Sequence, residues 1–296
     1  MGNKRDLAES IGIIGAGAMC AAVLSNLMRH GYRVLASDIR PEAEQAARAA
    51  GAEVVASAGE VVARCAVTIS LVRDAAETEA VLFGSQGAAA VLSGDRILLL
   101  SSTLAPSFVA GLGERLPGRK LLDAPVSGGP KRALAGTMSM MLAGEAATVA
   151  RVEPLLNQLA GKVFHLGQRL GLASTYKLLN NMAAAANLAA ASEAIALGCR
   201  LGLQPRVLAE VIAASSGASW VLADRLPRME APREVHAAID VLKKDLGLFR
   251  QLAAESQFDA PIGAAVHASF TAASAAGFGG EDDAALVDWL LARQPH

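Results

Sequence analysis

Cysteine is scarce in this chain of 296 residues. The three cysteines, Cys20, Cys65 and Cys199, stand far apart, with no CxxC pair and no neighbouring histidine. An odd number of widely spaced thiols excludes a full disulfide framework and is typical of a reducing compartment. We therefore expect a cytoplasmic protein without a metal site.

An excess of charge of either sign is also missing. Lysine and arginine together number 27, aspartate and glutamate 28, which leaves a formal net charge of -1. Without a basic excess, nothing draws the chain electrostatically to nucleic acid or to a membrane surface. Residues 11–27 are uncharged but are punctuated by glycines, and we find no other run of about 20 apolar residues free of turn formers. We expect neither nucleic acid nor a membrane as a partner.

Apolar residues are plentiful and are arranged in a repeating order. They make up 53% of the chain, enough for a large core, and the length suits two domains. Short apolar runs that alternate with alanine-rich helical stretches predict strands at 11–14, 33–37, 67–72, 97–101 and 120–123, and near 139–143 and 162–165. Because most runs are apolar throughout, we expect strands covered on both faces. The fold class is an α/β Rossmann domain with a doubly wound, mostly parallel sheet.

The character of the sequence changes after Gly171. Residues 174–201 contain no proline and predict one long helix, which Gly202 ends before Pro205 opens the next. Helical patterns continue to the last residue. We predict a Rossmann domain at 1–166 and an all-α domain at 167–296. The small apolar surface of the helical domain predicts an interface for a homodimer or homotetramer.

A glycine-rich turn follows the first predicted strand. Residues 15–20 read GAGAMC, the dinucleotide-binding pattern GxGxxG with Cys20 at the third glycine. Gly15 would make the tight turn and Gly17 would let the backbone approach a pyrophosphate, while the amides around Ala16, Ala18 and Met19 would face the phosphates. The pattern alone is a weak signal.

An acidic residue in the expected place strengthens the interpretation. Asp38 ends the second predicted strand, 23 residues after Gly15, where a carboxylate accepts hydrogen bonds from the adenosine ribose. Such a carboxylate repels a 2′-phosphate, which favours NAD over NADP, although Arg40 could partly reverse that preference. The alternative makes Asp38 the cap of a helix that begins at Pro41.

Three further segments offer polar groups for chemistry. Ser127, Gly128 and Gly129 form either a nest for a carboxylate or an ordinary turn. Lys177 and Asn181 are four residues apart and share a helix face. Together they could hold a substrate oxygen and exchange its proton, if burial or a nearby cation lowers the pKa of the lysine. The alternatives are a solvated Lys177 and, for Lys244, an i,i+4 pair with Asp240.

Four motifs in order resemble the β-hydroxyacid dehydrogenase family. They are GAGAM at 15–19, DAPVSGGPKRALAGT at 123–137, STYKLLNN at 174–181 and KKDLGL at 243–248. The family includes 3-hydroxyisobutyrate dehydrogenase and tartronate semialdehyde reductase and is related to 6-phosphogluconate dehydrogenase. The resemblance covers essentially the whole chain, with departures at Cys20 and at Ala173, where a second glycine often precedes the lysine.

The resemblance implies a role for each matching residue. Lys177 takes the proton of the substrate hydroxyl, and Asn181 positions the substrate. The resemblance also implies that Ser127, Gly128 and Gly129 contact the substrate carboxylate. It implies that Thr103 contacts the nicotinamide half of the cofactor, and that Leu71 and Val72 lie near its adenosine and pyrophosphate. Lys244 would reach both the cofactor and the active site. The resemblance therefore implies NAD, a small hydroxy-acid substrate and a dehydrogenase reaction.

The choice of substrate rests on three segments of the second domain. Residues 216–220, 270–274 and 277–283 resemble the L-threonate dehydrogenase branch, which implies a four-carbon sugar acid. The alternatives within the family are 3-hydroxyisobutyrate and tartronate semialdehyde or glyoxylate. An imine reductase, which by resemblance usually has Asp or Tyr in place of the lysine, is disfavoured by Lys177. A binding module without catalysis is the remaining alternative, and the same lysine argues against it.

Overall fold

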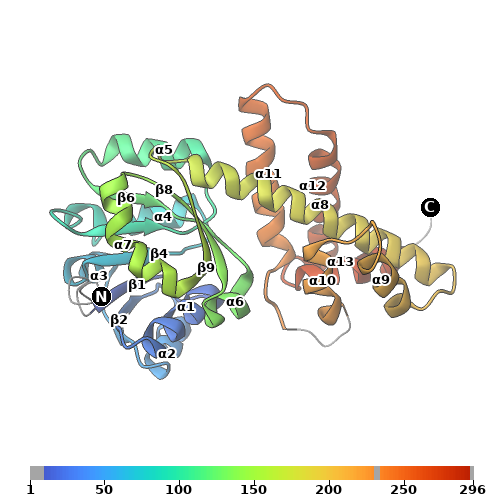
Figure 1. Cartoon of the computed structure of the whole chain (residues 1–296), viewed down its shortest axis with the longest axis horizontal. Helices are drawn as coiled ribbons and strands as arrows, with labels where there is room; N and C mark the ends of the chain where they lie inside the picture. The colour runs from blue at the N-terminus through green and yellow to red at the C-terminus, as the bar shows by residue number, and fades with distance from the viewer. Residues whose placement is uncertain (1–9, 230–233, 294–296) are drawn as a thin grey trace. The chain divides into compact units, whose positions relative to one another are not determined.

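The chain divides into two compact units, Met1–Lys177 and Leu178–His296. The computed structural model describes residues 10–229 and 234–293 of it. Figure 1 labels most of the elements of both units. The first unit contains a sheet flanked by helices, and the second is helical. The predicted Rossmann-type α/β fold followed by an all-α region is confirmed.

The sheet of the first unit runs in the order β3-β2-β1-β4-β5-β6-β8-β7, with β9 paired to β8. Neighbours from β3 to β6 are parallel, whereas β8 runs antiparallel to β6 and β7. The strands are β1 (Ser10–Ile14), β2 (Arg33–Ser37), β3 (Glu53–Val54), β4 (Val67–Ser70), β5 (Ile97–Leu100), β6 (Lys120–Asp123), β7 (Val126–Ser127), β8 (Met138–Ala143) and β9 (Ala160–Gly167). The sequence pattern missed β3 and β7, because strands of two residues leave no apolar run.

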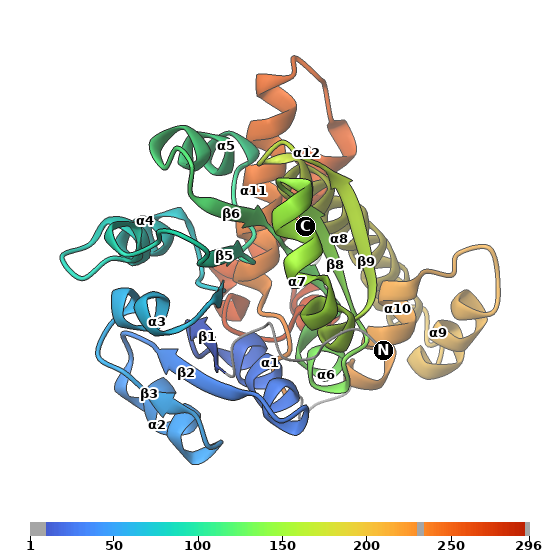
Figure 2. The same cartoon turned by 60° about the vertical axis from the view of Figure 1, so that its left-hand side comes forward.

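Helices cover both faces of this sheet, as Figure 2 shows. They are α1 (Ala18–Arg29), α2 (Pro41–Ala49), α3 (Ala58–Arg64), α4 (Ala75–Phe83), α5 (Pro106–Arg115), α6 (Gly129–Ala135) and α7 (Ala146–Leu159). Along β5, Ile97 and Leu99 enter one core with residues of α1 and α7, and Leu98 and Leu100 enter another with residues of α3 and α5. Successive side chains of a strand point to opposite faces, so continuous apolar runs need this double cover.

The second unit is built from helices. The long helix α8 (Leu172–Arg200) begins in the first unit and continues into the second, which adds α9 (Pro205–Ala213), α10 (Trp220–Arg225), α11 (Ile239–Glu255), α12 (Pro261–Ala273) and α13 (Leu286–Ala292). Phe270 of α12 and Trp289 of α13 are buried in its core with residues of α8 and α11. Within the described part of this unit the one strand-like pairing is an isolated bridge between Ala238 and Asp282.

Helix α8 departs from the expectation that no further stretch of the chain is long and apolar enough to cross a membrane. It is the one helix among the described residues that is long and apolar enough to cross a membrane, by length and composition alone. Its Ala185 and Leu188 are buried in the core of the second unit. Alanine makes a stretch apolar without making it bulky, and here that composition belongs to a core helix.

Candidate functional site

The glycine turn between β1 and α1 is locked to the loop after β4. Gly15 has a φ of +91°, and a Cβ on it would lie 2.6 Å from the Leu71 carbonyl oxygen. The Gly15 amide donates to the Ser37 carbonyl at 2.9 Å, and the Leu71 amide donates to the Ile14 carbonyl at 2.9 Å. Both the backbone conformation and the close approach therefore require glycine at this position.

The start of α1 fits a pyrophosphate. Gly17 is the N-cap residue, and the first turn, described throughout, has neither a side-chain cap nor an acidic residue. A Cβ on Gly17 would meet only the Arg40 guanidinium, at 3.8 Å. Helix-start amides that face no capping oxygen, with a cation beside them, suit a phosphate anion. The uncapped start of α1 thus suits the pyrophosphate that the sequence pattern predicts, whereas the amide of Ala16 donates to Asp38 instead of being open to a phosphate.

Cys20 fills the space where the pattern expects a third glycine. Its side chain is buried among the residues that pack α1 against the sheet, and its thiol donates to the Leu71 carbonyl at 3.6 Å. Burial, assisted by the charge of Asp38 and opposed by that of Arg40, raises the pKa of this thiol to about 12. Cys20 is therefore a protonated residue that packs α1 against the sheet beside the glycine turn.

Asp38 faces the glycine turn from the end of β2. Its Oδ2 accepts from the Ala16 amide at 2.5 Å and from Arg40 Nη2 at 3.2 Å, and its Oδ1 accepts from the amide and Nε of Arg40 at 2.8 and 3.1 Å. Burial acts to raise the pKa of Asp38, but these hydrogen bonds outweigh it and keep the pKa below its ordinary value. The N-cap of α2 is Arg40, so the alternative role of Asp38 as that cap is wrong.

A serine that the sequence analysis passed over fixes the loop after β4. Ser102, which follows β5, accepts a hydrogen bond at its Oγ from the Val72 amide at 2.9 Å. Leu71 and Val72, in the loop after β4, and Thr103, which follows Ser102, are all partly buried. The available signal was a polar residue directly after a buried strand, at the carboxyl edge of a parallel sheet where ligands bind.

The turn that carries the predicted carboxylate nest follows β7. Gly128 and Gly129 have φ values of +124° and +70°, and a Cβ on Gly128 would lie 2.8 Å from Arg132 Cδ. Gly128 is the N-cap of α6, and no side chain in this fully described segment caps that helix. The turn is therefore one that other residues adopt only with strain, and its amides suit an anion. Ser127 is the last residue of β7 beside it.

Lys177 and Asn181 are buried on α8, although both are polar. Their exposed fractions are 7% and 8%, whereas Tyr176 and Leu179 on the same helix are 50% and 51% exposed. The interpretation of Lys177 as a solvated lysine is wrong. Lys177 is the last residue of the first unit, which also contains the turn at Ser127. Asn181 belongs to the second unit.

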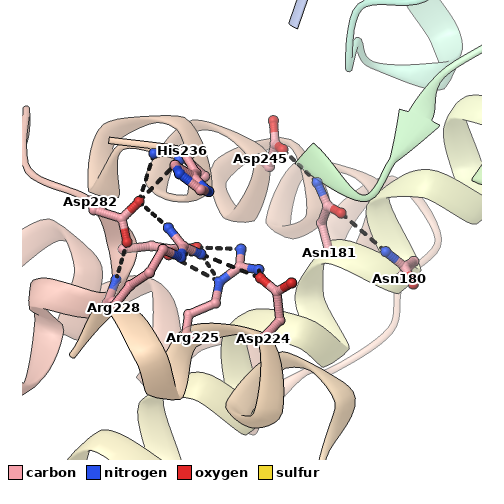
Figure 3. Close-up of polar contacts among 11 residues, drawn as sticks. Asn180, Asn181, Asp224, Arg225, Arg228, His236, Asp245 and Asp282 are labelled. Carbon is pink, nitrogen blue, oxygen red and sulfur yellow. Dashed lines mark hydrogen bonds and ion pairs between the residues drawn. The ribbon is translucent and has the colours of Figure 1, made fainter. Parts of the chain in front are cut away.

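A buried carboxylate on α11 orients the Asn181 amide (Figure 3). Asn181 Nδ2 donates to Asp245 Oδ2 at 2.6 Å, and Asn180 Nδ2 donates to Asn181 Oδ1 at 3.2 Å. Lys244 Nζ lies 2.7 Å from Asp245 Oδ1, an ion pair that lacks the angles of a hydrogen bond. These contacts determine which way the amide faces.

The alternative prediction for Lys244, an ion pair with Asp240, is wrong. Asp240 pairs instead with Lys243, at 2.6 Å, while Lys244 pairs with Asp245. Asp245 was quoted within the KKDLGL motif but was given no role. The sequence pattern that could have indicated a role for Asp245 is an acidic residue between Leu242 and Leu246, on the buried face of α11.

Comparison with known proteins shows which families this chain matches. Residues 10–167 match the NAD binding domain of 6-phosphogluconate dehydrogenase, and residues 171–290 match the NAD-binding family of NADP-dependent 3-hydroxyisobutyrate dehydrogenase. L-threonate dehydrogenase of Cupriavidus necator is 43% identical, over 95% of this chain and 96% of the relative.

Two solved structures extend the likeness to the fold. 3-Hydroxyisobutyrate dehydrogenase of Salmonella typhimurium is 32% identical with a TM-score of 0.86, over 94% of this chain and 99% of that one. The Mycobacterium tuberculosis 3-hydroxyisobutyrate dehydrogenase with L-serine is 30% identical with a TM-score of 0.81, over 96% and 99%. With matches across both units, this chain belongs to the β-hydroxyacid dehydrogenase family of nicotinamide-dinucleotide-dependent oxidoreductases that act on CH–OH groups.

Proposed function

We propose that the protein oxidises the hydroxyl of a four-carbon sugar acid such as L-threonate, with NAD as cofactor and Lys177 as acid/base. The carrying observation is the buried pair of Lys177 and Asn181, one helical turn apart, with the Asn181 amide held by Asp245 at 2.6 Å. The identity to the C. necator L-threonate dehydrogenase supports the substrate. A lysine withdrawn from water suits proton exchange near neutral pH better than one in solvent.

Each predicted residue has one task in this reaction. The amides of Gly128 and Gly129 and the hydroxyl of Ser127 bind the substrate carboxylate. Asn181 orients the substrate hydroxyl, Lys177 accepts its proton, and Lys244 reaches cofactor and substrate from α11. When bound, NAD supplies the acceptor for the hydride that leaves the carbinol carbon. In the reverse direction Lys177 returns the proton.

The contacts between Asp38 and Arg40 suggest how the protein would prefer NAD to NADP. The four donors to Asp38 include the Arg40 side chain, which is 51% exposed and has room to turn away. When it does, Asp38 can accept from the ribose hydroxyls of NAD, whereas Arg40 can pair with the 2′-phosphate of NADP.

The preference predicts opposite effects for two variants. Arg40→Ala is expected to lower kcat/KM with NADP at least tenfold and to leave kcat/KM with NAD within about threefold, because it removes only the phosphate partner. Asp38→Ala is expected to lower kcat/KM with NAD at least tenfold, and steady-state kinetics with both cofactors measure each change. Arg33→Ala, which removes an exposed arginine paired with Glu53, is the control. Equal losses with both cofactors in Arg40→Ala would contradict the mechanism.

The expectations about organisation remain part of the proposal. The NAD-binding domain ends near residue 166, a boundary supported by the family match that stops at residue 167. A homodimer or homotetramer forms through the helical domain, which exposes Leu197, Leu201, Leu203, Val207 and Val211. A cytoplasmic location agrees with the three free cysteines.

A panel of hydroxy acids tests the substrate. NADH absorbance is followed with purified protein, NAD and, separately, L-threonate, D-threonate, 3-hydroxyisobutyrate and glycerate. We expect the highest kcat/KM with L-threonate. The highest value with 3-hydroxyisobutyrate or glycerate would favour the alternative substrates, and NAD binding without turnover on any acid would indicate a binding module.

A further inference from the structure

Asp123 is a buried carboxylate to which neither the sequence motifs nor the proposed reaction assigns a role. It is the last residue of β6 and is inaccessible to solvent. Its Oδ2 accepts from the Ser174 amide at 2.9 Å, and its Oδ1 accepts from the Ser174 hydroxyl at 2.7 Å. Burial raises the pKa of Asp123, and these bonds, with those from the Gly171 and Ala173 amides, act against the rise.

The donors to Asp123 lie in the first turn of α8 and just before it, where four amides lack partners within the helix. A side chain at the start of a helix ordinarily accepts from these amides. Here the residue before Leu172 is Gly171, with a φ of +88°, and a Cβ on it would lie 2.4 Å from the Pro106 carbonyl oxygen. Glycine is required at this position and has no side chain to offer. Asp123, 51 residues away from Ser174, supplies the carboxylate instead.

The contact joins the two parts of the first unit that carry the proposed chemistry. Asp123 precedes Ser127 of the carboxylate turn by four residues, and Ser174 precedes Lys177 by three, or about one helical turn. Lys177 lies at the end of a rigid helical turn whose start is bonded to the end of β6. A shift of that turn would move the lysine relative to the carboxylate turn.

We propose that Asp123 is a positioning residue, which acts through Ser174 to hold Lys177 in place for proton transfer from the substrate. The inference rests on the proposed role of Lys177. Asp123 touches neither substrate nor cofactor in this account. Its removal is therefore expected to slow the chemical step and to leave NAD binding and the carboxylate turn largely intact.

Three variants test the proposal: Asp123→Ala, Asp123→Asn and Ser174→Ala. Misplacement of a reacting group by about 1 Å lowers a rate about a hundredfold, so we expect kcat of Asp123→Ala to fall by about that factor. Asp123→Asn retains one accepting oxygen and Ser174→Ala retains its amide, so both are expected to lose about three- to tenfold in kcat. The dissociation constant for NAD should stay within about twofold in all three, and KM for the acid should change less than kcat.

A kinetic isotope effect separates positioning from a loss of folded protein. With the acid deuterated at the carbinol carbon, the isotope effect on kcat should rise in the variants, because the chemical step becomes more fully rate-limiting. Rates are expressed per NAD-binding site, so that unfolded protein does not count. Ser57→Ala, which removes the hydroxyl that caps α3 by accepting from the Glu60 amide, is the matched control. It should lower the melting temperature without changing kcat or the isotope effect.

The outcomes distinguish this inference from the proposed function. If Ser174→Ala and Asp123→Asn keep the kcat and isotope effect of the unaltered enzyme while Lys177→Ala is inactive, the positioning role is overturned and the role of Lys177 stands. If Lys177→Ala itself retains activity, the proposed function fails first. If Asp123→Ala does not fold, the two milder variants, Asp123→Asn and Ser174→Ala, decide the question.

Discussion

Replacing Lys177 with alanine is expected to lower kcat by at least a thousandfold with whichever hydroxy acid the enzyme uses. General base catalysis contributes about two to four orders of magnitude, and the substrate hydroxyl has a high pKa that makes its proton difficult to remove without a base. Lys177 is buried, with 7% of the residue exposed, so water cannot readily take the place of its side chain. Steady-state NADH formation measures the loss.

NAD binding provides the internal control for that experiment. The glycine turn at Gly15 contacts Ser37 and Leu71, and Asp38 contacts Arg40, so titration of NAD should give a dissociation constant within about threefold of the unaltered enzyme. Lys177→Met retains most of the side-chain volume and is expected to be equally inactive. Lys162→Ala, on the exposed part of β9, should be fully active. Retention of a tenth of the activity in Lys177→Met would rule out the lysine as acid/base.

Replacing Asp282 with alanine is expected to destabilise the helical unit by about 3–5 kcal/mol, because it breaks a buried ion pair and leaves three backbone amides without their acceptor. Asp282 is inaccessible to solvent. It accepts from the His236 and Ala237 amides at 2.8 and 3.3 Å and from the Ala284 amide at 3.1 Å, and it pairs with Arg228 (Figure 3). The substitution removes all of these contacts, and the segment they hold leads directly into α11, which carries Lys244 and Asp245.

Urea unfolding followed by circular dichroism measures this loss. Asp224→Ala is the matched control, because Asp224 pairs with Arg225 and Arg228 but its side chain is 32% exposed, and its removal should lower the unfolding free energy by about 1 kcal/mol or less. Similar losses in the two variants would contradict the expectation.

The effect of Asp282 should also depend on pH. Burial acts to raise its pKa, but the amides of His236 and Ala284 and the charge of Arg228 keep the pKa below the ordinary value of 3.8. A carboxyl with a lowered folded-state pKa stabilises the fold above its unfolded pKa, and that contribution is lost as the pH falls through the folded pKa. The difference in unfolding free energy between Asp282→Ala and the unaltered protein should therefore shrink below about pH 4.

Local patterns in the amino-acid order were sufficient for the fold class and for the class of cofactor. Short apolar runs such as residues 97–100 are typical of strands covered on both faces, so they predict a doubly wound sheet wherever they alternate with helices. Gly15 and Asp38 are informative because the conformation and charge that a dinucleotide needs are carried by single residues at a characteristic spacing.

The partners of the polar residues required the folded chain. Asp123 bonds to Ser174 across 51 residues and Asn181 to Asp245 across 64, and the sequence motifs included all four without pairing them. The same holds for Lys244, whose near neighbour Asp240 pairs with Lys243 instead. Hydrogen bonds between distant residues depend on the path of the whole backbone, which no local periodicity encodes. Residue type and spacing therefore indicate the chemistry, and tertiary packing selects the carboxylates that orient it.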